Sequence, residues 1–200
     1  MSLETDFAMT RESLKGVQDE STYGGITSFL RRRYSRDLSG VDVAVLGVPF
    51  DLATTNRAGT RLGPRGIRTA SASLSWENQV QGWDFSPLEE LAIVDYGDCP
   101  FDAGTPDKVP EQIYQQARDI LATDTALLSL GGDHFVSYPL LRAHAEKYGP
   151  LALIHFDAHS DTWEDDGPRI DHGTMFYHAA KEGLVVPEYS AQIGLRTYNE

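Results

Sequence analysis

Cysteine, positive charge and long apolar runs are all scarce in this sequence of 200 residues. Its only cysteine, Cys99, cannot form a disulfide within the chain, which fits a reducing compartment. The polar N-terminus has no basic stretch followed by an apolar one, so we expect no secretion signal and a cytoplasmic protein. Because no apolar run approaches the roughly 18 residues of a transmembrane helix, we expect no membrane partner.

Acidic residues outnumber basic ones. Seventeen Lys and Arg face thirty Asp and Glu, which gives a formal net charge of -13 at pH 7. This charge repels nucleic-acid backbones and anionic membrane surfaces, so we expect neither as a partner. The basic run at residues 31–33 could contact another subunit or a phosphate, but we favour a solvated surface for it.

Short apolar runs alternate with helical patterns from residue 41 onward. The runs predict buried strands and the patterns predict helices of 10 to 14 residues, roughly. This alternation predicts a mostly parallel sheet covered by helices on both faces, a three-layer α/β/α sandwich. We expect strands at residues 41–48, 91–94, 126–130, 151–156 and 192–195, and helices at 64–74, 110–123 and 136–148.

The composition shows no break that would separate two domains. We therefore expect an N-terminal arm over residues 1–40 and one α/β domain over residues 41–200. Residues 192–195 look like a further strand without a closing helix, so we expect the sequence to stop within its fold, truncated at the C-terminus.

Two strand ends carry residues suited to metal binding, and ligands bind beyond the carboxyl ends of strands in open parallel sheets. The run 126–130 ends in two glycines, which allow a sharp turn, followed by Asp133 and His134. The run 151–156 ends in Asp157-Ala-His159-Ser-Asp161, and in an extended chain this spacing places all three side chains on one face.

Carboxylates gathered at the end of a buried strand repel each other and lose hydration, which a divalent cation offsets. Oxygen and imidazole ligands without thiolate favour Mn²⁺, while Fe, Co, Ni and Zn remain open. His155 has the same parity as Asp157, so it is either a donor behind the metal ligands or a hydrogen-bonded core histidine. We expect Asp133 to orient the turn, and His144 and His178 to lie in helices as structural or surface residues.

These motifs resemble the ureohydrolase family, the binuclear manganese enzymes that include arginases and agmatinases. The resemblance runs from about residue 20 to the end of the chain, and within the family it is strongest to bacterial agmatinases. The matching segments are GGDH at 131–134, DAHSD at 157–161 and DHGTMF at 171–176, supported by residues 47–51 and 57–68.

The resemblance implies a cofactor of two Mn²⁺ per subunit. His134 and Asp161 would bind one ion, His159 the other, and Asp157 would bridge both. Asp161 and His172 are the implied catalytic residues, with Asp161 managing the proton of the bridging solvent and His172 acting as proton shuttle. Two further aspartate ligands and a glutamate that binds the guanidinium lie beyond residue 200 in the family pattern, so no substrate-binding residue is identified.

The implied activity is hydrolysis of a small guanidino substrate, with agmatine giving putrescine and urea, by a homo-oligomer that is a trimer or hexamer. Guanidinobutyrate, guanidinopropionate, arginine and formimidoylglutamate remain alternative substrates, and a non-catalytic relative is the alternative class. Residues 163–171 hold four acids against one arginine, which favours the ammonium tail of agmatine. The alternative is that Glu164, Asp165 and Asp166 only solvate an exposed turn.

Overall fold

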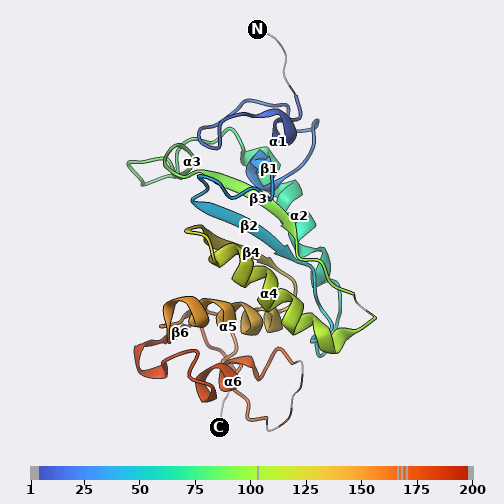
Figure 1. Ribbon diagram of the computed structural model, residues 1–200, viewed down its shortest axis with the longest axis vertical. Helices are drawn as coiled ribbons and strands as arrows, with labels where there is room; N and C mark the ends of the chain where they lie inside the picture. Colours follow the sequence, from blue (N-terminus) through green and yellow to red (C-terminus); the bar gives the residue numbers. More distant parts are fainter. Residues whose placement is uncertain (1–4, 103, 166, 168, 170, 198–200) are drawn as a thin grey trace. The chain divides into compact units, whose positions relative to one another are not determined.

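The computed structural model describes residues 5–102, 104–165, 167, 169 and 171–197 (Figure 1). None of the helices in these ranges is both long and apolar enough to cross a bilayer. The division into an arm over residues 1–40 and one domain over 41–200 stays a prediction. The chain forms two compact units: unit 1 comprises Met1–Pro49, Leu62–Cys99 and Ala122–Gly132, and unit 2 comprises Phe50–Arg61, Pro100–Leu121 and Asp133–Glu200.

Unit 1 contains a four-stranded sheet in the order β1-β3-β2-β4, and all of its pairings are parallel (Figure 1). The central strand β2 is almost entirely buried, as its continuous apolar sequence requires when both faces of a strand are covered. The predicted α/β class with parallel strands is therefore confirmed. The strands are β1 (Arg33–Tyr34), β2 (Val43–Val48), β3 (Ile93–Asp98) and β4 (Ala126–Gly131).

Strand β3 extends four residues beyond the predicted end at residue 94, and the first of these residues is a buried aspartate. Asp95 is fully buried, and its carboxylate accepts hydrogen bonds from the guanidinium of Arg68 at 2.7 and 2.9 Å. A buried aspartate becomes tolerable in a strand when a charged donor pairs with it. A sequence pattern based on apolar residues misses such a position.

The helices of unit 1 are short. The predicted helix at residues 64–74 is present, with Pro64 in its first turn and a final turn of 3-10 geometry. The apolar core of the unit includes Val45, Ile93 and Leu130 from three different strands, packed with Leu88. The elements are α1 (Phe7–Thr10), η1 (Phe29–Arg31), α2 (Gly63–Ser71), η3 (Ala72–Leu74) and α3 (Pro87–Glu90). The turn η2 (Thr60–Leu62) precedes α2 in the chain, and its first two residues belong to unit 2.

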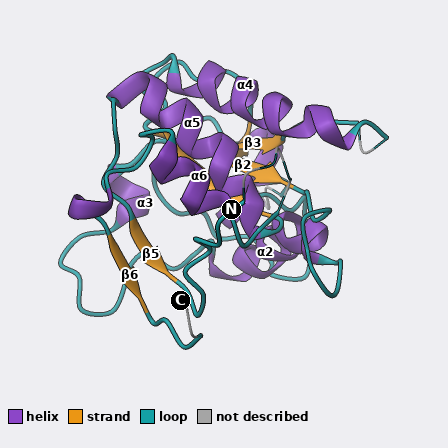
Figure 2. Cartoon of the chain, turned by 90° about the horizontal axis from the view of Figure 1, so that it is seen from below, coloured by secondary structure: helices purple, strands orange, loops and turns teal. Residues whose placement is uncertain are grey.

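Unit 2 combines a helical layer with a two-stranded parallel sheet of β5 and β6 (Figure 2). Helices α4 and α5 lie where the sequence predicts them and pack against each other. The register of the sheet places His155 directly opposite Gln192. The elements are η4 (Pro106–Lys108), α4 (Val109–Leu121), η5 (His134–Val136), α5 (Ser137–Tyr148), β5 (Ile154–Phe156), α6 (Met175–Lys181), η6 (Pro187–Tyr189) and β6 (Ala191–Ile193).

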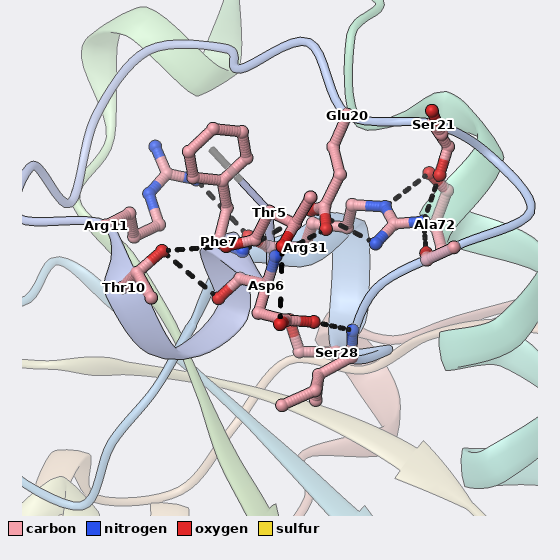
Figure 3. A network of polar contacts seen from close by, with 12 residues as sticks. Thr5, Asp6, Phe7, Thr10, Arg11, Glu20, Ser21, Ser28, Arg31 and Ala72 are labelled. Atoms are coloured by element: carbon pink, nitrogen blue, oxygen red, sulfur yellow. Dashed lines mark hydrogen bonds and ion pairs between the residues drawn. The ribbon is translucent and has the colours of Figure 1, made fainter. Parts of the chain in front are cut away.

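The basic run is not a solvated surface, and that prediction is wrong for two of its three arginines. Arg31 and Arg32 are 2% and 1% exposed. Arg31 pairs with the buried carboxylate of Glu20 at 3.1 Å and donates to the carbonyl oxygens of Ser21 and Gly24 at 2.9 and 2.6 Å (Figure 3). Burial lowers the pKa of Arg32 to about 10, which still leaves it charged at neutral pH.

The Glu20–Arg31 ion pair links the start of helix α1 with the turn η1. The Glu20 carboxylate also accepts from the backbone N–H of Asp6 at 2.6 Å, and the Arg31 Nε donates to the carbonyl of Ala72 at 3.4 Å (Figure 3). Removing one partner of such a buried pair leaves an uncompensated charge in the interior. The pair therefore fastens α1 to the rest of unit 1.

We expect Glu20→Gln to lower the free energy of unfolding by about 3–5 kcal/mol, the usual cost of breaking a buried ion pair from one side. Urea unfolding followed by circular dichroism measures this difference. Glu12→Gln, at an exposed acid of the same segment, is the matched control and should change stability little. Equal stabilities of the two variants would contradict a fastening role for Glu20.

Candidate metal centre

His134 is the first residue of η5, and Asp133 fixes the turn that presents it. The Asp133 carboxylate accepts from the backbone N–H of Phe135 at 3.0 Å and from that of Ala53 at 2.9 Å. Burial raises the pKa of this carboxyl. Asp133 therefore orients the turn, as the sequence predicted, and ties it to the loop that begins at Phe50.

The DAHSD segment turns instead of continuing the strand. Strand β5 ends at Phe156, the backbone N–H of His159 donates to the Asp157 carboxylate at 3.0 Å, and Asp161 has a left-handed φ of 53°. The expectation of one extended face is therefore wrong, because an aspartate side chain that accepts from the backbone two residues later stabilises a turn. This turn decides which side chains converge.

Four side chains converge within unit 2. The Nδ1 atom of His134 lies 2.7 Å from Oδ2 of Asp161 and 3.2 Å from Oδ2 of Asp157. The Nε2 atom of His155 lies 3.4 Å from the same Asp157 oxygen. One ligand atom from each of the four lies within 4.8 Å of the others, and we call His134, His155, Asp157 and Asp161 the His–Asp cluster.

The His–Asp cluster fits a divalent cation. Asp161 and His155 are 9% and 6% exposed, so the carboxylate and the imidazole have little water around them. The His155 Nε2 atom is buried and has no hydrogen-bond partner. Burial, followed in size by the neighbouring His134, lowers the pKa of His155, which favours its neutral ring. Two carboxylates facing imidazole nitrogens are a ligand set that Mn²⁺ and related ions accept.

The remaining predicted ligand, His159, is placed differently. Its side chain is 62% exposed, and its Nδ1 atom lies 3.5 Å from Oδ1 of Asp157 rather than inside the cluster. The structure therefore brings together three of the four predicted ligands, His134, Asp157 and Asp161, and adds His155 to them.

The cluster opens into a hollow of about 610 Å³, which we call the cluster hollow. Three aspartates and three histidines line it, together with the Trp163 indole. No lysine or arginine belongs to the part of its lining that the structure describes. The lining residues are Thr55, His134, Asp157, His159, Ser160, Asp161, Trp163, Asp171, His172, Gly173 and Thr197.

His172 contacts a residue that the sequence analysis missed. Its Nε2 atom lies 3.3 Å from the hydroxyl oxygen of Thr55, which is 117 residues away in the chain. The loop that carries Thr55 folds around the buried Asp51 carboxylate, which accepts from the backbone N–H of Gly59 and from Nε of Arg61, both at 2.6 Å. The hydrogen bond from Arg61 is the main reason that the pKa of Asp51 is lowered.

The acidic segment 163–171 divides between two places. Trp163 and Asp171 line the cluster hollow, and the Asp171 carboxylate accepts from the backbone N–H of Gly173 at 2.7 Å. Glu164 instead accepts from the Tyr177 hydroxyl at 3.4 Å, and Asp165 lines a separate hollow beside α6. Asp166, the third of the acidic residues that the sequence analysis considers for the substrate tail, lies outside the described residues.

Comparison with known proteins places this geometry in a family. The model of the arginase family matches residues 41–200. An agmatinase from Chromobacterium violaceum is 57% identical over 98% of this chain, and this chain covers 61% of it.

Two solved structures share the fold. A crystal structure of a hypothetical agmatinase from Burkholderia thailandensis is 55% identical with a TM-score of 0.95, covering 98% of this chain and 62% of its own. Proclavaminate amidino hydrolase from Streptomyces clavuligerus is 35% identical with a TM-score of 0.78, covering 90% of this chain and 60% of its own. The chain thus spans about three fifths of the length of these relatives, and it belongs to the arginase family.

Proposed function

We propose that the full-length protein is a manganese-dependent hydrolase that converts agmatine and water into putrescine and urea. The observation that carries the proposal is the convergence of Asp157 and Asp161 on His134 at the end of β5. The identity to relatives named agmatinase, 57% over nearly the whole chain for one of them, supports agmatine as the substrate.

Two Mn²⁺ per subunit are the proposed cofactor. By the family resemblance, His134 and Asp161 would hold one ion, His159 the other, and Asp157 would contact both. When bound, such a pair lowers the pKa of a shared water and supplies hydroxide at neutral pH, which a poorly electrophilic guanidinium requires.

The protein's own side chains would handle the protons. Asp161, 9% exposed and beside His134, is placed to hold a proton released by the attacking water. His172 lies on the wall of the cluster hollow, where an imidazole can donate a proton to the nitrogen of the departing amine. The contact with Thr55 restrains the ring of His172 on that wall.

The charges of the cluster hollow favour a substrate with a cationic tail. Asp157, Asp161 and Asp171 lie on its wall, where Asp171 pairs with the exposed Arg169 guanidinium at 3.1 Å, and the described lining itself includes no basic side chain. An ammonium group is attracted by such a wall and a carboxylate is repelled. This supports agmatine over guanidinobutyrate, guanidinopropionate, arginine and formimidoylglutamate.

We also propose that the protein is a cytoplasmic homo-oligomer, a trimer or hexamer. The family resemblance supports the assembly. The single cysteine supports a reducing compartment, and burial raises the pKa of Cys99 to about 12, so its thiol stays protonated.

We expect Asp157→Ala in the full-length protein to remove bound manganese and abolish urea release, because Asp157 is the proposed ligand of both ions. Metal analysis after dialysis gives the stoichiometry. Asp119→Ala, at an exposed aspartate of α4, is the control and should leave two ions bound. Unchanged manganese in Asp157→Ala would show a purely structural aspartate.

We expect His172→Ala to lower kcat by about 10²- to 10⁴-fold, the range for loss of a general acid, while manganese stays bound. Steady-state urea release and metal analysis on the same preparation separate these two effects. Turnover at the wild-type level would remove His172 from the mechanism, and full turnover loss together with metal loss would assign it to the metal site.

For the substrate tail, we expect kcat/KM to be higher for agmatine than for guanidinobutyrate or arginine, with a wider gap at low salt. Asp171→Asn should reduce this difference in kcat/KM, since the amide keeps an acceptor for the Gly173 N–H and loses the negative charge. Glu164→Gln is the matched control, because Glu164 does not line the cluster hollow. A preference for guanidinobutyrate would overturn the substrate assignment.

A further inference from the structure

We propose that Gln192 and His155 form a relay in which the Gln192 amide holds the Nε2–H group of His155 against the Asp157 carboxylate, so that His155 is a positioning residue and not a metal ligand. The inference rests on the proposed metal site, because the relay ends at a proposed ligand of both ions. It assigns a role to Gln192, which the sequence analysis placed in a strand without a function.

The relay begins with the register of two strands. β5 and β6 are parallel neighbours (Figure 2), and His155 is the direct partner of Gln192 in their register. Partners in a parallel pair project to the same face of the sheet, so these two side chains meet. A shift of one residue would present Ala191 or Ile193 instead, and neither could bond to an imidazole.

The side-chain amide of Gln192 has both of its hydrogens engaged. Its Nε2 atom donates to the carbonyl oxygen of Ser160 at 2.7 Å and lies 3.1 Å from Nδ1 of His155. Because a carbonyl oxygen only accepts, the contact with Ser160 requires the amide nitrogen, and not the amide oxygen, at this position. The same nitrogen therefore donates to His155, whose Nδ1 must be the acceptor.

This arrangement fixes the tautomer of His155. A neutral imidazole carries one proton, so with Nδ1 as the acceptor the proton is on Nε2. Nε2 is the atom that lies 3.4 Å from Oδ2 of Asp157. The N–H group of the ring is therefore the group next to the carboxylate, at contact distance although outside hydrogen-bond geometry. In this place an outer donor can orient a metal ligand.

The alternative, in which His155 binds the metal through Nε2, requires the proton on Nδ1. That proton would face the N–H of Gln192, and rotating the amide to avoid it would bring two acceptors, the amide oxygen and the Ser160 carbonyl, to the 2.7 Å contact. His155 is 6% exposed, so water cannot relieve either conflict. His155 therefore lies beside Asp157 because it orients that carboxylate, and not because it binds the metal.

The first experiment replaces the hydrogen-bond donor of Gln192 by an acceptor in a side chain of nearly the same shape. In Gln192→Glu, a carboxylate replaces the donor and draws the imidazole proton to Nδ1. We expect ¹⁵N NMR of metal-free, ¹⁵N-histidine-labelled full-length protein to show the Nε2–H tautomer of His155 in the wild type and the Nδ1–H tautomer, or a protonated ring, in the variant. An Nδ1–H tautomer in the wild type would overturn the proposal.

The second experiment separates a donor from a ligand and also applies if Gln192→Glu does not fold. We expect His155→Leu to weaken Mn²⁺ binding by about 10- to 100-fold in chelator competition, the range for an outer-shell partner. His155→Gln, which keeps an N–H donor, should retain most of the affinity. Equal losses in both variants would show that His155 is a ligand, and no loss in either would show a residue that only packs.

His144→Leu is the matched control, since this histidine of α5 bonds to the carbonyl of Leu140 at 2.8 Å and lies outside the His–Asp cluster. It should bind Mn²⁺ as the wild type does. Failure of the wild type to bind Mn²⁺ would count against the proposed function, whereas the tautomer in the metal-free protein tests the relay on its own.

Discussion

Two carboxylates that approach one imidazole are the constraint around which unit 2 is arranged. Asp157 and Asp161 approach His134 to 3.2 and 2.7 Å, and their repulsion must be offset by positive charge or by hydrogen bonds. The surrounding elements supply part of that compensation through backbone and side-chain donors. The rest is what makes the His–Asp cluster suitable for a cation.

Polar residues that need not touch a metal keep this arrangement in place. Asp133 joins the turn before His134 to the loop at Ala53, and Asp51 shapes the same loop so that Thr55 reaches His172. Each carboxylate accepts two backbone N–H groups, those of Phe135 and Ala53 for Asp133 and those of Gly59 and Arg61 for Asp51. In this unit, buried carboxylates therefore have two roles. Some hold the loops that carry the proposed catalytic side chains, and others are candidate metal ligands.

Two sequence interpretations failed for the same reason, which is that they treated local spacing as sufficient. The basic run was expected in solvent, but a glutamate eleven positions earlier, Glu20, pairs with Arg31 in the interior. The DAHSD segment was expected to be extended, but the Asp157 carboxylate accepts a hydrogen bond from the backbone N–H of His159, two residues later, and the chain turns. A side chain's hydrogen-bond partner decided the outcome in both cases.

The alternation of apolar runs and helical patterns determined the α/β class, the parallel pairing and the approximate bounds of most elements, because burial on both faces imposes that pattern on a sequence. The residue types at two strand ends likewise indicated a metal site before any coordinates. Only the tertiary structure decided which of those residues converge. His155 joins the cluster and His159 remains 62% exposed, and Thr55 reaches His172 across 117 residues. These outcomes depend on strand register, on a turn closed by one carboxylate and on a contact between distant segments, none of which leaves a periodic signal in the sequence.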